Sequence, residues 1–330
     1  MFPQGFFCAR KGGAMDINGE KSFIALLSVI SNALLVVMKL AAGLVTGSVS
    51  ILSEAIHSGM DLVASMIALF AVRASAKPAD EDHPFGHGKF ENISGAVEAL
   101  LIFLAAGWII FEAVKKLLHP QPLHETSVGI LVMLISSIVN IFISMRLFKI
   151  GRETDSVALL ADAWHLRTDV YTSVGVMLGL AGIWLLGFLF PSNDFQWIDP
   201  VAAILVAVLI LKAAYDLTVT SVKDLLDIGL PDEDMKLIIN KVSENERVCG
   251  LHGLRSRKSG AVRFVEFHLK LEPDMTVMQS HLITEKIEND IRNIWNACEL
   301  SIHVEPCSKH CSTKCLSGCF LRNCEDAHSS

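Results

Sequence analysis

The sequence predicts a membrane all-α bundle of six transmembrane helices, followed by a small cytoplasmic α+β domain. Hydrophobic residues make up 52% of the 330-residue chain, which is a high share for a soluble protein. They are concentrated in six stretches within the first two thirds of the chain, each at least as long as the roughly 20 residues that cross a bilayer. Beyond residue 224 the apolar stretches become short and amphipathic, as in a water-soluble domain.

The six apolar stretches set the expected transmembrane helices and the order of the domains. We place the spans near residues 23–47, 48–74, 93–114, 126–148, 156–188 and 198–219. A tight Thr46-Gly47-Ser48 corner joins the first two. The expected parts are an N-terminal cytoplasmic segment, the transmembrane domain, the cytoplasmic domain and a cysteine-rich tail, at residues 1–21, 22–222, 223–306 and 307–330.

Lys and Arg in the loops predict the orientation of the helices. They occur before the first span, after the second and fourth spans and after the sixth, whereas the loop 191–196 has neither. The positive-inside rule therefore places both termini in the cytoplasm, although Lys115 and Lys116 at the outer end of the third span depart from the pattern. The N-terminus shows no cleavable signal peptide, and Met15 is an alternative start.

The cytoplasmic part shows the element order αββαβ. Pro231 and the three acidic residues after it are typical of a helix start, and this helix is expected to end near Asn245. Alternating apolar and polar residues then predict strands, and an amphipathic pattern predicts a second helix. In chain order these elements are a strand, a strand, a helix and a strand, at 251–257, 262–271, 276–295 and 300–304.

Charge and cysteine content argue against a nucleic-acid-binding protein and against a disulfide-stabilised protein. The formal net charge is -7, so nothing indicates a nucleic-acid partner. Five cysteines crowd the last 24 residues, and an odd number argues against a closed disulfide framework. A thiolate collector for soft metals and a disordered tail with free thiols both fit the four cysteines that recur every four residues, Cys307, Cys311, Cys315 and Cys319.

Two strings inside the apolar stretches share the pattern His-x-x-x-Asp. One contains His57 and Asp61, and the other contains His165 and Asp169. Residues four apart lie on one face of a helix, so each string presents an imidazole beside a carboxylate. Both histidines are roughly 13 Å into their spans, at about 1.5 Å per residue, and the two spans run antiparallel. Two nitrogens and two carboxylates at one level suit zinc or a similar transition metal.

Helix packing alone would explain one buried histidine, but two matching pairs in separate spans favour a metal site. A metal ligand must lose its proton, and imidazole titrates near neutral pH, so metal and protons compete for such a site. Glu54 and Asp162 each precede a histidine by three residues, and they support the ligands, line a water path or ligate the ion directly. Arg167 is two positions from His165 and should point away, towards an interface or a carboxylate partner.

These motifs resemble the cation diffusion facilitator family, and within it the bacterial YiiP-type zinc transporters. The resemblance covers about residues 20–306 and implies six transmembrane helices, a metallochaperone-like cytoplasmic domain, a homodimer and metal/proton antiport. Some YiiP-type members carry Asp in place of His57, and the two-His, two-Asp set resembles zinc-preferring relatives rather than an all-carboxylate manganese site. The matching strings are the two His-x-x-x-Asp pairs, Thr46-Gly47-Ser48-Val49-Ser50-Ile51-Leu52, Pro78-Ala79-Asp80 and His83-Pro84-Phe85-Gly86-His87-Gly88-Lys89.

The loop after the second span holds a further expected site. Asp80, His83 and His87 form a small cluster of oxygen and nitrogen ligands, which the resemblance implies to be a second, interfacial metal site. A solvated acidic loop with incidental histidines is the alternative. Lys89 and Asp227 match a family ion pair near the dimer interface, where the membrane and cytoplasmic domains meet.

The cytoplasmic domain carries residues that the resemblance assigns to a binuclear zinc site between two copies. They are His252, His268, His281, His303 and Glu305. His303 and Glu305 point to the same face of a strand, and Glu305 is a longer carboxylate where the family pattern has Asp. Metal there would stabilise the dimer and sense cytoplasmic zinc, whereas ordinary surface histidines are the alternative.

Together these features predict a proton-coupled exporter of a divalent cation, chiefly Zn²⁺, in a bacterial inner membrane. Zn²⁺ is expected both as cargo and as regulator, with no organic cofactor. The expected partners are protons, membrane lipid and a second copy of the chain, and no nucleic acid. Cd²⁺, Fe²⁺ or Co²⁺ as main cargo, and a membrane metal sensor that moves no ions, are the alternatives. No His-Glu-x-x-His occurs, which argues against an intramembrane metalloenzyme.

Overall fold

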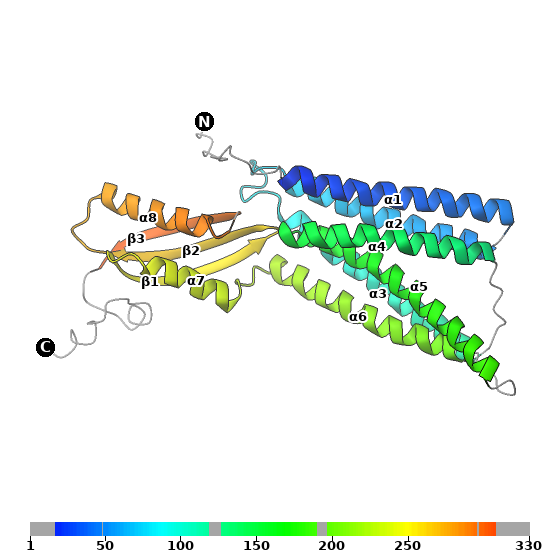
Figure 1. Cartoon of the computed structure of the whole chain (residues 1–330). Coiled ribbons are helices and arrows are strands. Elements are labelled where there is room, and N and C mark those ends of the chain that lie inside the picture. The colour runs from blue at the N-terminus through cyan, green and yellow to red at the C-terminus, as the bar shows by residue number, and fades with distance from the viewer. Residues whose placement is uncertain (1–16, 48, 119–126, 190–196, 296, 308–330) are drawn as a thin grey trace. The chain divides into compact units, whose positions relative to one another are not determined.

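The computed structural model of the chain describes residues 17–47, 49–118, 127–189, 197–295 and 297–307. The chain divides into two compact units, residues 1–218 and 219–330. The first unit is built from long helices, and the second combines two helices with a sheet (Figure 1).

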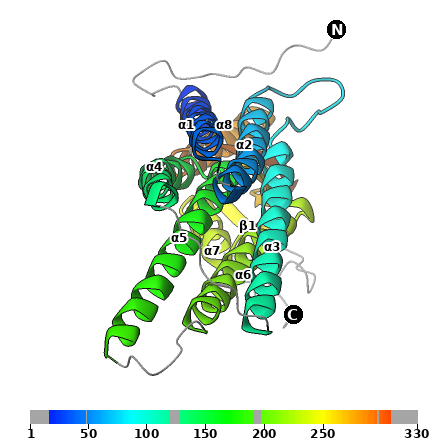
Figure 2. The ribbon, with the colours of Figure 1, turned by 90° about the vertical axis from the view of Figure 1, so that its right-hand side faces the viewer.

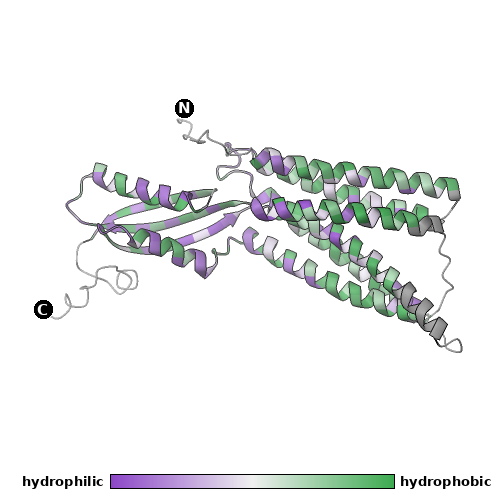
Figure 3. Ribbon diagram, in the orientation of Figure 1, coloured by the Kyte–Doolittle hydropathy of each residue, from purple (hydrophilic) through white to green (hydrophobic). Residues whose placement is uncertain are grey.

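The first unit contains six long helices within its described residues. Five of them hold a stretch that is long and apolar enough to cross a membrane, and hydrophobic residues cover these helices in Figure 3. The exception is the fifth helix, whose passage through the membrane stays a prediction. The helices are α1 (Ile17–Thr46), α2 (Val49–Ser75), α3 (Lys89–Leu118), α4 (Ser127–Glu153), α5 (Val157–Leu189) and α6 (Ile198–Leu225).

Helix α5 is the central helix of this unit. It contacts α2, α3 and α4, while α1 packs on α2 and α4 (Figure 2). It also approaches α6 closely, because a Cβ atom added at Gly175 would lie 2.7 Å from Val206 Cγ2. Alanines make similar close contacts among α3, α5 and α6, for example Ala99, Ala161 and Ala214. Small residues let membrane helices approach closely and gain dispersion energy, so α5 is held from several sides.

A buried polar network joins the ends of four elements. Glu91, near the start of α3, forms an ion pair with Lys21 of α1, and both side chains are at most 5% exposed. The same carboxylate accepts a hydrogen bond from Ser75 of α2 at 2.8 Å and another from Ser156, the residue before α5. A buried carboxylate needs several donors to offset its lost hydration, and these three donors provide that compensation.

The second unit has the element order αββαβ, as the sequence predicts. Its sheet has the strand order β1-β2-β3, in which β1 pairs antiparallel with β2 and β3 pairs parallel with β2. Helix α8 connects the two parallel strands, because parallel neighbours need a long crossover. The elements are α7 (Asp232–Ser243), β1 (Val248–Ser259), β2 (Val262–Leu271), α8 (Val277–Arg292) and β3 (Cys298–Pro306).

The core of the second unit lies on one face of the sheet. Val265, Phe267 and Leu269 alternate along β2 and are buried, and they pack with Ile238 of α7 and Ile287 of α8. Successive residues of a strand point to opposite faces. The polar residues between them, which include His268, therefore lie on the face of the sheet opposite this core.

The helices extend beyond the apolar stretches predicted from the sequence. Helix α3 begins at Lys89 instead of near residue 93, and α4 ends at Glu153 instead of near residue 148. Hydropathy marks the part of a helix that suits lipid, whereas backbone hydrogen bonding continues into polar flanks. Gly47 separates α1 from α2 with a φ of 63°, which glycine adopts at little cost.

Candidate metal centre

The two His-x-x-x-Asp pairs meet inside the helical unit. Helix α2 supplies His57 and Asp61, α5 supplies His165 and Asp169, and the two helices run in opposite directions (Figure 1). Each histidine is the ninth residue of its helix, about 12 Å from the helix start. Ligand atoms of His57, Asp61 and Asp169 lie within 4.8 Å of one another, and His165 Nε2 lies 3.1 Å from Asp61 Oδ1. The structure therefore brings all four predicted side chains together.

Helix α4 adds an amide that the sequence analysis missed. Asn140 Nδ2 donates to Asp169 Oδ2 at 3.5 Å, and Asn140 is buried. Within the part of the chain that the structure describes, Asn140 Oδ1 and His165 Nδ1 are buried atoms with no hydrogen-bond partner. Buried polar atoms usually have partners, and unpaired ones are costly. This arrangement is typical of a site organised for a ligand rather than for stability.

We call His57, Asp61, His165 and Asp169 the intramembrane cluster. Lys39 of α1 places a positive charge beside this cluster. Its ammonium is buried, donates to Ser58 Oγ at 2.7 Å and lies 3.3 Å from Glu54 Oε2. It is close enough to interact electrostatically with Asp61 and Asp169. Glu54 therefore has a cationic partner within the protein. Lys39 could have been identified as a functional candidate from the sequence, because it is the lone charged residue of the first predicted span.

We expect Lys39→Gln to strengthen zinc binding by the intramembrane cluster about ten-fold. The ammonium repels a dication in a medium that screens charge poorly, and the substitution removes that repulsion. Titration calorimetry measures the change in protein that also carries Asp80→Ala and Glu305→Ala, which removes the carboxylates of the two other predicted metal sites. Lys115→Gln is the control, because Lys115 pairs with Glu112 at 3.5 Å on an exposed surface of α3. Equal or weaker zinc binding by Lys39→Gln would contradict this electrostatic role.

Two fully buried acids lie near the cluster without being part of it. Asp162 is one helical turn before His165 on α5, and Glu98 is on α3. Among the described residues, neither oxygen of Asp162 has a hydrogen-bond partner, while Ser94 donates to Glu98 Oε1 at 3.3 Å. Asp162 is not in the group of converging ligand atoms. Glu98 was missed in the sequence analysis, although an acid inside an apolar stretch is itself a signal.

The loop before α3 brings its three predicted residues together. Asp80 binds both histidines, with Oδ1 lying 3.3 Å from His83 Nδ1 and Oδ2 lying 3.3 Å from His87 Nε2. The backbone N–H of His83 also donates to Asp80 at 2.7 Å, and this bond lowers the pKa of the Asp80 carboxyl below its usual value. His87 is buried, and its Nδ1 lies 3.2 Å from the carbonyl oxygen of Pro78. The loop is therefore ordered around an ionised carboxylate between two imidazoles.

A row of histidines crosses the sheet of the second unit. His252, His268 and His303 stand opposite one another on β1, β2 and β3, and neighbouring ring centroids are 4.9 Å apart. Glu305 joins two of them, with its oxygens 2.7 Å from His268 Nδ1 and 3.0 Å from His252 Nε2. We name these four residues the histidine row. Ligand atoms of His252, His268 and Glu305 lie within 4.8 Å of one another.

The charge of the histidine row is set by its carboxylate. The hydrogen bond from His268, and then that from His252, lowers the pKa of Glu305 to about 2. Glu305 is therefore an anion at neutral pH and can accept a cation. Cys298, at the start of β3, differs because burial raises the pKa of its thiol to about 11. It is protonated at neutral pH, whereas a metal ligand must be a thiolate.

The other predicted residues are not gathered into these clusters. His281 lies on α8, outside the described residues whose ligand atoms converge. Cys307 is buried, and its backbone N–H donates to the carbonyl of Leu271 at 2.8 Å, so it belongs to the folded unit rather than to the tail. Lys89 and Asp227 belong to different units, and their ion pair stays a prediction. Three of the predicted thiolates lie outside the described residues, namely Cys311, Cys315 and Cys319.

Comparison with known proteins assigns the family. The family model of the "Cation efflux transmembrane domain" matches residues 25–226, and the family model of the "Cation efflux protein, cytoplasmic domain" matches residues 230–307. The chain belongs to the cation diffusion facilitator family. The family relatives include the cation-efflux pump FieF of Citrobacter koseri, which is 33% identical over 286 residues, or 86% of this chain and 92% of that protein.

Further relatives agree with this family. The cation-efflux pump FieF of Yersinia pestis is 34% identical over 284 residues, which cover 86% of this chain and 92% of that protein. A solved structure of CzrB in its zinc form is 30% identical and covers 26% of this chain and 98% of that chain, with a TM-score of 0.24. That score is too low for the structure to bear on the fold. Family membership and the five apolar helices make the chain a multi-pass membrane protein.

Proposed function

We propose that this chain exports a divalent cation, chiefly Zn²⁺, in exchange for protons across a bacterial inner membrane. One observation carries the proposal: His57 and Asp61 of α2 converge with His165 and Asp169 of α5 between apolar helices. Ionisable groups inside membrane helices are costly and mark ion pathways. Relatives described as cation-efflux pumps support export as the direction. All six helices are proposed to span the membrane, with both termini in the cytoplasm.

The donor set supports zinc as the main cargo. Two imidazole nitrogens and two carboxylates provide four ligands, and the two negative charges neutralise a dication. Zinc accepts such mixed tetrahedral sets, whereas manganese prefers oxygen ligands. Cd²⁺, Fe²⁺ and Co²⁺ can use the same donors, so a metal-competition flux assay ranks the cargoes.

The contact between His165 and Asp61 supports coupling to protons. His165 Nε2 and Asp61 Oδ1 lie 3.1 Å apart, so the two proposed ligands hold each other through a hydrogen bond. A metal ion that binds both atoms must displace the shared proton. Alternating exposure of the cluster would then carry metal in one direction and protons in the other.

A flux measurement in vesicles tests this function. The purified protein is reconstituted into liposomes that contain a zinc-sensitive dye, and zinc entry is followed under two opposite pH gradients. An antiporter is expected to move zinc faster when protons flow against it. A sensor that moves no ions gives no flux under either gradient, and equal flux under both gradients would refute proton coupling.

The loop cluster and the histidine row are proposed to bind metal without transporting it. Asp80, His83 and His87 would capture the ion at the cytoplasmic mouth of the helical unit. The histidine row lies on the sheet face opposite the core of its unit, which leaves it available to a second copy. Zinc there would neutralise clustered charge and stabilise a homodimer with a metallochaperone-like domain, so the transporter would respond to cytoplasmic zinc.

We expect Glu305→Gln to weaken zinc binding by the histidine row about ten- to a hundred-fold. The carboxylate supplies the negative charge between His268 and His252, and an amide cannot replace it. The affinity is measured by equilibrium dialysis of the Asp61→Ala/Asp80→Ala/Asp169→Ala protein, which lacks the carboxylates of the intramembrane cluster and of the loop cluster. Glu266→Gln is the matched control, because Glu266 is an exposed acid of β2 that lies outside the row. Unchanged zinc affinity in Glu305→Gln would exclude the row as a metal site.

A further inference from the structure

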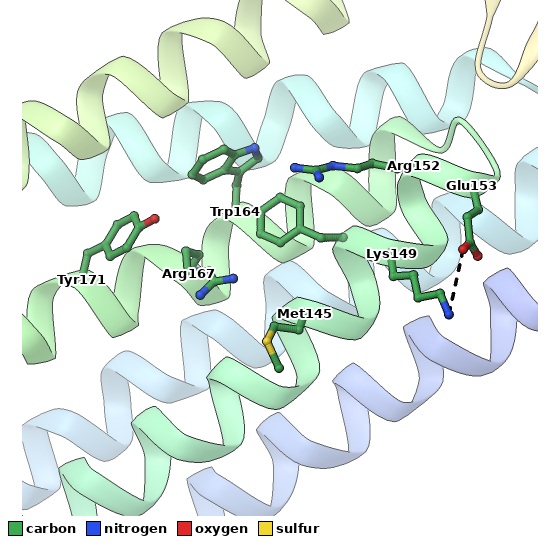
Figure 4. A pocket seen from close by; sticks show the side chains of 8 residues that line it. Met145, Lys149, Arg152, Glu153, Trp164, Arg167 and Tyr171 are labelled. Carbon is green, nitrogen blue, oxygen red and sulfur yellow. Dashed lines mark ion pairs between the residues drawn. The ribbon is translucent and has the colours of Figure 1, made fainter.

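A cationic pocket lies between α4 and α5, away from the proposed metal sites. The cavity has a volume of about 650 Å³, and Figure 4 shows the side chains that line it. On α5 the lining residues include Arg167 and Tyr171, which are four positions apart. Asp169 lies midway between them in sequence and His165 precedes Arg167 by two positions, so both face a different side of the helix. The pocket and the intramembrane cluster therefore lie on two different sides of helix α5.

The pocket has more positive than negative charge. Its walls carry the cations Lys149, Arg152 and Arg167 and a single acid, Glu153. Glu153 lies 4.0 Å from Lys149, and Figure 4 marks this ion pair. The structure gives no ion pair or hydrogen bond between either guanidinium and another described residue. Two guanidinium groups are therefore left to bind an anion that the described chain does not supply.

Both guanidinium groups pack against the same aromatic ring. The Phe148 ring centroid is 5.5 Å from Arg152 Cζ and 5.7 Å from Arg167 Cζ. Trp164 supports this ring edge-on, with the ring centroids 5.2 Å apart. Guanidinium groups stack on aromatic faces and keep their N–H donors free for oxyanions. This packing explains why Arg167 needs no carboxylate within the protein.

We propose that this pocket binds the phosphate headgroup of an anionic phospholipid. Guanidinium groups bind phosphate oxygens strongly, because such hydrogen bonds join two charged partners, and two of them line this pocket. A membrane lipid fits better than a soluble anion, because the pocket is open between two helices that are proposed to span the membrane and Met145 extends it with an apolar surface. Basic pockets between transmembrane helices are known to hold lipid headgroups. Arg167 would then be an intramembrane charge whose partner is a lipid.

Native mass spectrometry of the purified full-length protein tests the proposal. Phosphatidylglycerol and phosphatidylcholine are titrated separately, and sodium phosphate is added as a competitor. The protein is expected to bind phosphatidylglycerol at least about ten-fold more tightly than phosphatidylcholine. The preference should disappear in Arg152→Gln/Arg167→Gln and persist in Arg146→Gln. Arg146 is the matched control, because it is an exposed cation of α4 that does not line the pocket.

A charge-conserving variant tests whether the loss of lipid binding in the double glutamine variant comes from misfolding. Arg152→Lys/Arg167→Lys keeps both charges but loses the planar donors, so its affinity for phosphatidylglycerol should be intermediate. Three results would each overturn the proposal. These are no preference for phosphatidylglycerol in the unmodified protein, a preference that survives in the double glutamine variant, and displacement by sodium phosphate at concentrations similar to those of the lipid. The last result would assign the pocket to a soluble anion.

Discussion

Asp61→Ala and Asp169→Ala are each expected to abolish zinc flux in proteoliposomes. The two carboxylates supply all the negative charge of the proposed ligand set, and Asp61 also holds His165 at 3.1 Å. With either acid removed, a dication would keep an uncompensated charge inside the membrane, which is strongly unfavourable. Zinc entry should fall to the rate of protein-free vesicles. The measurement is the initial rate of the change in dye fluorescence under the pH gradient that favours zinc entry.

The control for this loss is an acid outside the cluster. Glu112→Gln removes an exposed carboxylate of α3 and should leave the flux unchanged. Size-exclusion chromatography of each variant shows whether the protein remains folded and of the same size. Normal zinc flux in a folded Asp61→Ala or Asp169→Ala protein would remove the basis of the proposed transport site.

Glu91→Gln is expected to destabilise the protein by about 3–5 kcal/mol. The substitution leaves the ammonium of Lys21 buried without an anion, and an uncompensated buried charge is costly. Ser75 and Ser156 would also lose a charged acceptor, so the contacts among α1, α2, α3 and α5 would weaken together. Thermal unfolding of the purified protein should show a lower midpoint.

A double substitution separates the charge from the packing. Lys21→Met/Glu91→Leu removes both charges and fills the space with apolar side chains, so its stability should be close to that of the unmodified protein. Glu112→Gln, which breaks an exposed ion pair, should cost about 1 kcal/mol or less. A midpoint in Glu91→Gln equal to that of the unmodified protein would show that the network does not stabilise the fold.

Much of the fold could be predicted from local patterns. The apolar stretches locate the long helices, because the bilayer sets their length and composition. The His-x-x-x-Asp spacing predicts which side chains share a helix face, and the equal depth of His57 and His165 predicts that the two pairs can meet. Alternation along 262–271 likewise predicts β2 and its outward-facing His268.

Contacts between elements could not be predicted in the same way. Nothing in the alternation of Leu300 to Val304 tells whether β3 runs parallel or antiparallel to β2, since direction depends on the crossover of α8. The amide of Asn140 is an ordinary polar residue in the sequence and gains its role only from its distance to Asp169. Arg167 points away from His165 as expected, but its aromatic partner Phe148 is on another helix.

The sequence by itself determined the membrane class, the helical faces of the ligand pairs and the order of elements in the second unit. These features follow from periodicity and from the length of a bilayer crossing, which act within one segment. The tertiary structure alone decided that Lys39 stands beside the cluster and that Lys21 pairs with Glu91 across 70 residues. It also left His281 outside the converging histidines. Such contacts depend on how separate helices and strands pack, and that information is not local to any stretch of sequence.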